Sequence, residues 1–217
     1  MSMMTFYMTP GSCSTGIHII LEELDESFAV TVVNLPSRDH FKADFVAVNP
    51  KSTIPVLVGR DGRVLTEVSA IAYWLARTHP RARLWPDAID LETRAIEMMA
   101  YITGTIHGQG FARIFTTSSF TNHEPELSDV KENGYQIVEK GFAVLNQTLA
   151  TEEYALGSFS VVDPVLFYVE FWADKLNMTL PERLASHYRL MLARPAVQRV
   201  LREEGYNPAT LGLAPKR

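Results

Sequence analysis

The 217-residue chain has a composition typical of a globular protein, with 47% hydrophobic and 21% charged residues. This length suggests one or two domains with enough residues for a sizeable core. A formal net charge of -5 gives no reason to expect a nucleic acid or an anionic membrane as a partner. The single cysteine excludes a disulfide within the chain, so the fold does not depend on an oxidising compartment.

The longest apolar runs are too short to span a bilayer, so we expect no membrane partner. The first residues read as a strand, without the basic stretch and long apolar run of a secretory signal. We therefore expect a cytoplasmic protein.

The first elements read as strand, helix and strand. A short apolar run at 4–8 and a β-branched run at 28–33 are typical of strands. Between them, apolar residues recur at helical spacing from Ile17 onward. A strand–helix–strand unit of this length predicts a parallel pair of strands joined by a right-handed crossover.

A second group of elements follows the polar stretch 36–48, which we expect to be a loop with a short helix. An Asp-Gly pair lies between the apolar runs 54–58 and 64–66, and this pattern predicts a hairpin. Residues 67–78 then read as a helix with one apolar face. The sequence therefore predicts an α/β domain over residues 1–79.

The composition changes at His79, where a stretch with two prolines reads as a linker. Beyond it we find helical patterns and no convincing strand, beginning with a long helix over about 87–115 that we expect to bend at its glycines. Ser160 and Asp163 fit a capping box at the start of a later helix. The sequence predicts an all-helical domain over residues 87–217.

The only cysteine lies where a reactive group is expected. Cys13 follows the first strand and a Thr-Pro-Gly-Ser turn, and it opens the first helix. Free N–H groups and the dipole of a helix N-terminus favour a negative charge, so we expect the pKa of this thiol to be lowered. The alternative is a small buried residue without a chemical role.

Pro55 stands where a strand should begin, a position at which proline is tolerated and at which a cis peptide bond is a candidate. A cis bond would turn the backbone carbonyl and N–H of Ile54 outward, free to pair with an extended peptide. The alternative is an ordinary trans proline in an edge strand.

The order and spacing of one family recur in six segments, at 10–13, 49–57, 65–71, 101–115, 159–163 and 172–177. Through these segments the chain resembles the cytosolic glutathione transferases. The cysteine in the first turn makes the chain most similar to the bacterial beta class. The resemblance implies a thioredoxin-like N-terminal domain followed by an all-α domain, with glutathione as co-substrate.

The resemblance also implies a site. Cys13 corresponds to the thiol that contacts glutathione sulfur or forms a mixed disulfide with it, and His107 to a histidine of the helical domain near that sulfur. The positions implied for glutathione binding are Arg38, Ile54, Pro55, Glu67 and Val68. The positions implied for a second-substrate pocket are Phe111, Phe115 and Trp172.

Two positions depart from the family's pattern. Val68 lacks the hydroxyl that many members offer to the γ-glutamyl carboxylate, and Ala100 stands where beta-class relatives can have a polar residue. Two implied roles also have plain structural alternatives, because His107 fits a core histidine and Glu67 fits an acidic residue at a helix start.

The function implied is an enzyme that binds glutathione and either transfers it to a small hydrophobic electrophile or exchanges it with a disulfide through Cys13. The alternative is a non-catalytic glutathione- or ligand-binding protein that retains the fold. No cluster of His, Cys and acidic residues has ligand spacing, so we expect no metal. Apolar faces on 67–78 and on the helix from Asp87 predict a homodimer.

Overall fold

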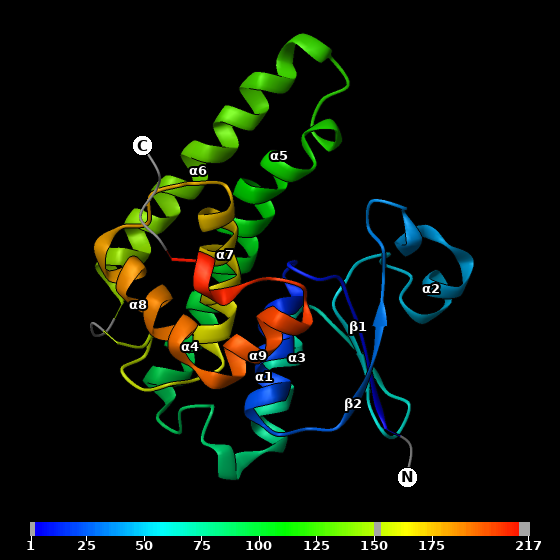
Figure 1. The fold of residues 1–217 in the computed structure, drawn as a ribbon, viewed down its shortest axis with the longest axis vertical. Helices are drawn as coiled ribbons and strands as arrows, with labels where there is room; N and C mark the ends of the chain where they lie inside the picture. Colours follow the sequence, from blue (N-terminus) through cyan, green and yellow to red (C-terminus); the bar gives the residue numbers. More distant parts are fainter. Residues whose placement is uncertain (1–2, 150–152, 213–217) are drawn as a thin grey trace.

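The computed structural model describes residues 3–149 and 153–212. Its strands gather in one sheet at one side of the molecule, and helices form the rest (Figure 1). All strands precede residue 67, and the described chain beyond Ile89 consists of helices and connecting loops. The change of composition at His79 therefore coincides with the end of the α/β part.

Strand β1 (Met4–Met8) lies inside a four-stranded sheet with the order β2-β1-β3-β4. It pairs in parallel with β2 (Phe28–Val32) and antiparallel with β3 (Val56–Val58). Strand β3 in turn pairs antiparallel with β4 (Val64–Thr66). These pairings confirm the predicted parallel strand pair and the predicted hairpin. Together with the helices that cover it, this sheet forms the thioredoxin-like part of the fold.

Helices cover both faces of the sheet. Helices α1 (Ser14–Glu23) and α3 (Val68–Thr78) lie between the sheet and the other helices, and the short α2 (Ala43–Val48) lies on the opposite face (Figure 1). Alternate side chains of β1 point to opposite faces, so Tyr7 packs against Phe45 of α2, with 5.9 Å between ring centroids. The buried residues on the α1 side are Met4, Phe6 and Met8.

The second half is built around helix α7 (Val162–Lys175). This helix is buried over nearly its whole length, because α1, α4 (Ile89–Ala100) and α8 (Glu182–Ala193) pack around it. Within the described residues, no helix combines the length and the apolar character that a membrane crossing requires. The helices of this half are α4 (Ile89–Ala100), α5 (Ala112–Phe115), α6 (Leu127–Thr148), α7 (Val162–Lys175), α8 (Glu182–Ala193) and α9 (Pro195–Glu203).

The expected long helix over about 87–115 is present, but its middle is a π-helix and not an α-helix. The segment Tyr101–Phe111 continues α4 as a π-helix before α5 begins. Gly110 lies against α6 so closely that an added Cβ would meet Val138 Cγ2 at 2.6 Å. Wide helical turns of this kind occur often at functional sites, and His107 lies in this one.

The predicted capping box is confirmed at the start of α7. The Ser160 backbone N–H donates to Asp163 Oδ2 at 2.7 Å, and the Val162 N–H donates to Ser160 Oγ at 3.3 Å. Asp163 also accepts a hydrogen bond from the Ala155 N–H at 2.7 Å. The buried carboxylate therefore ties the preceding loop to the helix.

A buried histidine joins this carboxylate to a second one. His187 of α8 lies 2.8 Å from Glu170 Oε2 through Nδ1 and 3.2 Å from Asp163 Oδ1 through Nε2. Burial alone would lower the pKa of His187, but the charges and hydrogen bonds of the two carboxylates outweigh it and raise the pKa to about 10. The imidazolium is therefore the folded form at neutral pH.

This cluster gives a pH-dependent contribution to stability. Because the folded pKa of His187 lies above its ordinary value, the contribution is complete below about pH 6.5 and disappears as the pH rises to about 10. The variant His187→Gln should lower the free energy of unfolding by about 3 kcal/mol at pH 6. The difference should shrink between pH 7 and pH 10, which denaturant titrations at several pH values would measure.

The exposed His123 supplies the matched control. His123→Gln should leave both the stability and its pH dependence close to those of the wild type. An equal pH slope for wild type and His187→Gln would contradict the assignment of a charged, buried His187.

Candidate active site

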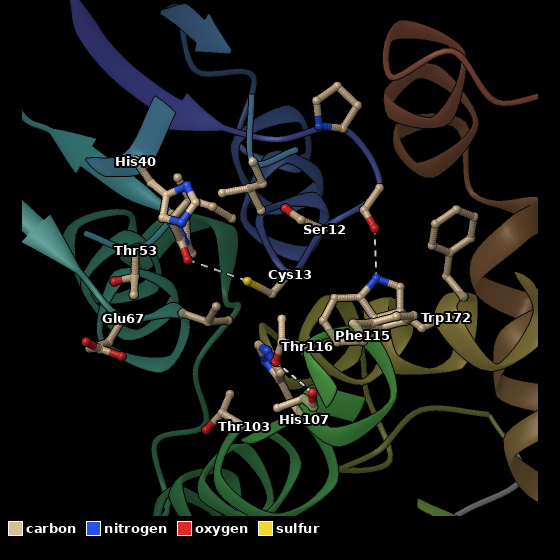
Figure 2. Close-up of a pocket in the computed structure, with 18 of the residues that line it drawn as sticks. Ser12, Cys13, His40, Thr53, Glu67, Thr103, His107, Phe115, Thr116 and Trp172 are labelled. Atoms are coloured by element: carbon tan, nitrogen blue, oxygen red, sulfur yellow. Dashed lines mark hydrogen bonds between the residues drawn. The ribbon is translucent and has the colours of Figure 1, made fainter. Parts of the chain in front are cut away.

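A cleft of about 770 Å³ lies where the two halves meet. One wall comes from the turn after β1, the segment before β3 and the start of α3. The other comes from the π-helical segment, α5 and α7 (Figure 2). A volume of this size suits a small-molecule ligand, and both polar and apolar side chains reach it.

Cys13 lines this cleft and lies between its two walls (Figure 2). Its Sγ is 3.6 Å from the Ile54 carbonyl oxygen and donates to it, and the residue is 6% exposed. Burial raises the pKa of the thiol to about 12, and the nearby charge of Glu67 adds to this. The backbone N–H groups of Cys13 and Ser14 lower the pKa by less. The predicted lowered pKa is therefore wrong, because desolvation outweighs the helix N-terminus.

The segment before β3 contains the cis peptide bond that the sequence made a candidate at Pro55. The Ile54–Pro55 peptide bond is cis, and both residues line the cleft. The carbonyl oxygen of Ile54 faces the thiol. The backbone of Ile54 therefore presents a hydrogen-bonding group beside Cys13, the only cysteine of the chain.

Glu67 and Val68 also line the cleft. Glu67 has a φ of 71° and immediately precedes α3, and its exposed side chain pairs with Lys51 Nζ at 2.7 Å. Val68 is the first residue of α3, so its N–H belongs to a helix N-terminus and has no partner within the helix. The adjacent Ser69 lines the cleft too and offers the hydroxyl that Val68 lacks.

Arg38 is not among the residues that line the cleft. Its backbone is left-handed, with a φ of 59°, and its guanidinium lies 5.0 Å from the centroid of the Phe41 ring. The basic side chains on this wall are those of Lys51 and His40. Sequence reasoning missed both, although Lys51 lies within the stretch 49–57 that carries the resemblance.

His107 reaches the cleft from the opposite wall. Its Nδ1 lies 3.2 Å from the hydroxyl of Tyr168, and its ring meets Trp172 edge-on with 4.9 Å between centroids. Burial lowers the pKa of His107 to about 4, so the imidazole is neutral at pH 7. Tyr168 was not predicted, since it reads as one of several core aromatics of α7.

The three residues expected in a second-substrate pocket separate into two layers. Phe115 and Trp172 line the cleft, with 5.2 Å between ring centroids. Phe111 is fully buried behind them and stacks on Phe115 at 5.7 Å. Phe111 therefore supports the wall and is not a lining residue. Tyr206, which the sequence did not indicate, lines the cleft as well.

The turn before Cys13 is held by the helical half. The Gly11 N–H donates to Glu204 Oε2 at 2.7 Å, and its carbonyl oxygen accepts from Trp172 Nε1 at 2.7 Å. Gly11 has a φ of 72°, and an added Cβ would lie 2.0 Å from the hydroxyl oxygen of Tyr206. Glycine is therefore required here by both conformation and space.

One cluster of possible metal ligands lies outside this cleft. Ligand atoms of His18, Glu22 and Glu203 lie within 4.8 Å of one another, which sequence spacing did not reveal because α1 and α9 are far apart in the chain. Glu22 Oε2 is 2.7 Å from Arg199, and His18 Nδ1 is 2.9 Å from Glu204 Oε1. Glu22 is thus already paired with a cation, and each ring nitrogen of His18 already has a carboxylate partner.

Comparisons with known proteins agree with this geometry. The family model "Glutathione S-transferase, N-terminal domain" matches residues 11–78. Glutathione S-transferase GstA of Escherichia coli O157:H7 is 33% identical over 207 residues, covering 93% of this chain and 99% of GstA. Glutathione S-transferase GST-4.5 of Xanthomonas campestris is 26% identical over 208 residues, covering 94% and 100%.

Solved structures share the fold over the same length. A glutathione transferase homologue from Sulfitobacter with bound glutathione has a TM-score of 0.87 at 26% identity, covering 94% of this chain and 99% of the homologue. A beta-class glutathione S-transferase from Sphingomonas chungbukensis has a TM-score of 0.79 at 28% identity, covering 93% and 98%. From the likeness to GstA over almost its whole length, together with the N-terminal domain match, the chain belongs to the glutathione S-transferase family.

Proposed function

We propose that the protein is a glutathione transferase that conjugates glutathione to a small apolar electrophile in the cleft between its halves. One observation carries this proposal. The cleft joins a polar wall, made by the Ile54 backbone, Glu67 and the start of α3, to an aromatic wall, with Cys13 between them. Such a cleft suits a peptide thiol on one side and an apolar partner on the other.

The polar wall complements glutathione group by group. The carboxylate of Glu67 suits the ammonium of the γ-glutamyl residue, and the first N–H groups of α3 suit its carboxylate. The backbone of Ile54 suits the cysteinyl amide, and Lys51 and His40 suit the glycyl carboxylate. Lys51 pairs with Glu67, so glutathione binding would exchange this ion pair for contacts with the ligand.

The buried thiol favours conjugation over exchange. With its pKa raised to about 12, Cys13 stays protonated at neutral pH and does not repel a glutathione thiolate beside it. When the cysteinyl N–H of glutathione donates to the Ile54 carbonyl oxygen, the Cys13 S–H no longer needs that acceptor and can donate to the glutathione thiolate. The thiolate then attacks the electrophile: a carbon–sulfur bond forms, the bond to the leaving group breaks, and the thiol proton passes to solvent.

The second candidate function is thiol–disulfide exchange through a mixed disulfide between Cys13 and glutathione. Its support is the position of the thiol in the cleft, where a bound sulfur would meet it. It ranks second because a protonated thiol is a poor nucleophile. A non-catalytic binding protein is not favoured, since the relatives are named transferases and the cleft keeps Cys13, Glu67 and His107.

We also propose that residues 1–79 and 87–217 are the two domains, and that the protein is cytoplasmic and works as a homodimer. The dimer is supported by exposed apolar side chains on neighbouring helices. Ile89 and Ile96, seven residues apart on α4, are 71% and 56% exposed, and Tyr73 of α3 is 45% exposed. Apolar residues gathered in this way are typical of an interaction surface.

Glu67→Gln should weaken glutathione binding about tenfold, because it removes a charge-assisted hydrogen bond at a partly exposed position. Titration calorimetry with glutathione would measure the change. Glu139→Gln, an exposed substitution on α6, is the control for loss of one negative charge. Unchanged binding together with a much lower melting temperature would make Glu67 a structural residue and the proposed site misplaced.

Two substitutions of Cys13 test whether its thiol acts as a hydrogen-bond donor or as a nucleophile. Cys13→Ser keeps a hydrogen-bond donor and should keep kcat/KM for conjugation within about tenfold, whereas Cys13→Ala should lower it by about 10- to 100-fold. Alkylation of the wild-type thiol should still be rising above pH 9, since its pKa lies near 12. Fast alkylation at pH 7 with ready formation of a glutathione adduct would favour exchange instead.

Light scattering should give twice the protomer mass of 24.4 kDa at micromolar concentration. The double variant Ile89→Asp, Ile96→Asp should be monomeric, because it places charges on the proposed interface. Val144→Asp, at an apolar residue of α6 that is 40% exposed, is the matched control and should stay dimeric. A monomeric wild type would remove the homodimer proposal.

A further inference from the structure

The aromatic wall of the cleft ends at a lysine. Lys175 lies in the last turn of α7, three residues after Trp172, and lines the same cleft as Phe171 and Tyr206. Its Nζ is 5.5 Å from the centroid of the Tyr206 ring. A cation therefore borders the part of the cleft that carries the aromatic side chains Phe115, Phe171 and Trp172.

This cation has no counter-ion within ion-pairing distance in the described ranges 3–149 and 153–212. The neighbouring Asp174 is engaged elsewhere, since its Oδ2 accepts hydrogen bonds from the Tyr188 hydroxyl and the Gly212 N–H, both at 2.9 Å. The other lysine of the cleft, Lys51, pairs with Glu67. His107 is neutral at pH 7, because burial lowers its pKa to about 4. Lys175 is exposed to solvent, and no carboxylate of the described residues pairs with its charge beside this aromatic surface.

We propose that the second substrate is an amphipathic electrophile, with an apolar or aromatic body on Phe115 and Trp172 and an acidic group that pairs with Lys175. The inference rests on the proposed function and names the substrate class of the same site. The chain has a net charge of -5, which disfavours anionic ligands overall. Binding of an anionic substrate therefore requires a local cation in the cleft.

The geometry also sets where the acidic group belongs. The Trp172 indole donates to the carbonyl of Gly11, two residues before Cys13, so this ring is tied to the turn that carries the thiol. Lys175 lies three residues further along α7, a rise of about 4.5 Å. The acidic group should therefore be at the end of the substrate opposite the reacting carbon, as in 4-(chloromethyl)benzoate. There the glutathione thiolate attacks the benzylic carbon, a carbon–sulfur bond forms, and chloride leaves with the carbon–chlorine bonding pair.

Lys175 also has a structural alternative, because a cation in the last turn of a helix complements the helix dipole and can stack on an aromatic ring. The test must therefore measure selectivity rather than stability. Two products, S-benzylglutathione and S-(4-carboxybenzyl)glutathione, differ only in the acidic group. Titration calorimetry of both gives a ratio of dissociation constants that is independent of catalysis.

The wild type should bind the carboxylated product about two- to fivefold more tightly, with a preference that declines as salt rises. Lys175→Met should abolish the preference and Lys175→Arg should keep it. Lys140→Met, which removes an exposed lysine from α6 outside the cleft, should also keep it. The ratio of kcat/KM for 4-(chloromethyl)benzoate and benzyl chloride should follow the same order across these variants.

Two results would overturn the inference while leaving the proposed function in place. One is equal binding of the two products by the wild type, and the other is a preference that survives in Lys175→Met. If neither product binds, the glutathione site itself fails and the inference falls with it.

Discussion

The site depends on one glycine that the helical half holds from both sides. Glu204 accepts the Gly11 N–H and Trp172 donates to the Gly11 carbonyl, both at 2.7 Å. Glu204 is 7% exposed and also accepts from the Thr15 hydroxyl, so its buried carboxylate is well supplied with donors. Since Cys13 follows this turn directly, the packing of the helical half on α1 fixes where the sulfur lies.

The packing of the helical half on α1 also excludes water from the centre of the cleft, and this determines the protonation state of the groups there. Burial raises the pKa of the Cys13 thiol and lowers that of the His107 imidazole, so both groups are neutral at pH 7. The charged groups of the cleft, Glu67, Lys51 and Lys175, lie at its more exposed margins. The centre itself holds no charged side chain and can accept one negative sulfur, with Glu67 as the nearest negative charge, while the margins recognise the ends of the ligands.

Local patterns were enough to predict the order of strands and helices, and they made Pro55 a candidate for a cis bond. A shared site for Cys13, Glu67 and His107 was implied by the family resemblance and not by local patterns. The sign of the Cys13 pKa shift was not predictable, because burial arises from contacts with segments far along the chain. Glu204 and Tyr206 were missed for the same reason. Phe111 and Phe115 lie one helical turn apart, yet only Phe115 faces the cleft, and helix periodicity does not reveal which face a π-helical segment presents. Arg38 was misplaced because its loop has no regular pattern.

The central claim is that glutathione binds along the polar wall of this cleft. Amide hydrogen exchange with and without saturating glutathione tests it directly, because backbone groups that pair with a ligand exchange more slowly. We expect slower exchange in residues 11–14, 52–56 and 67–70, with little change in α8. Unchanged exchange in all three segments, or protection confined to the helical half, would contradict the account.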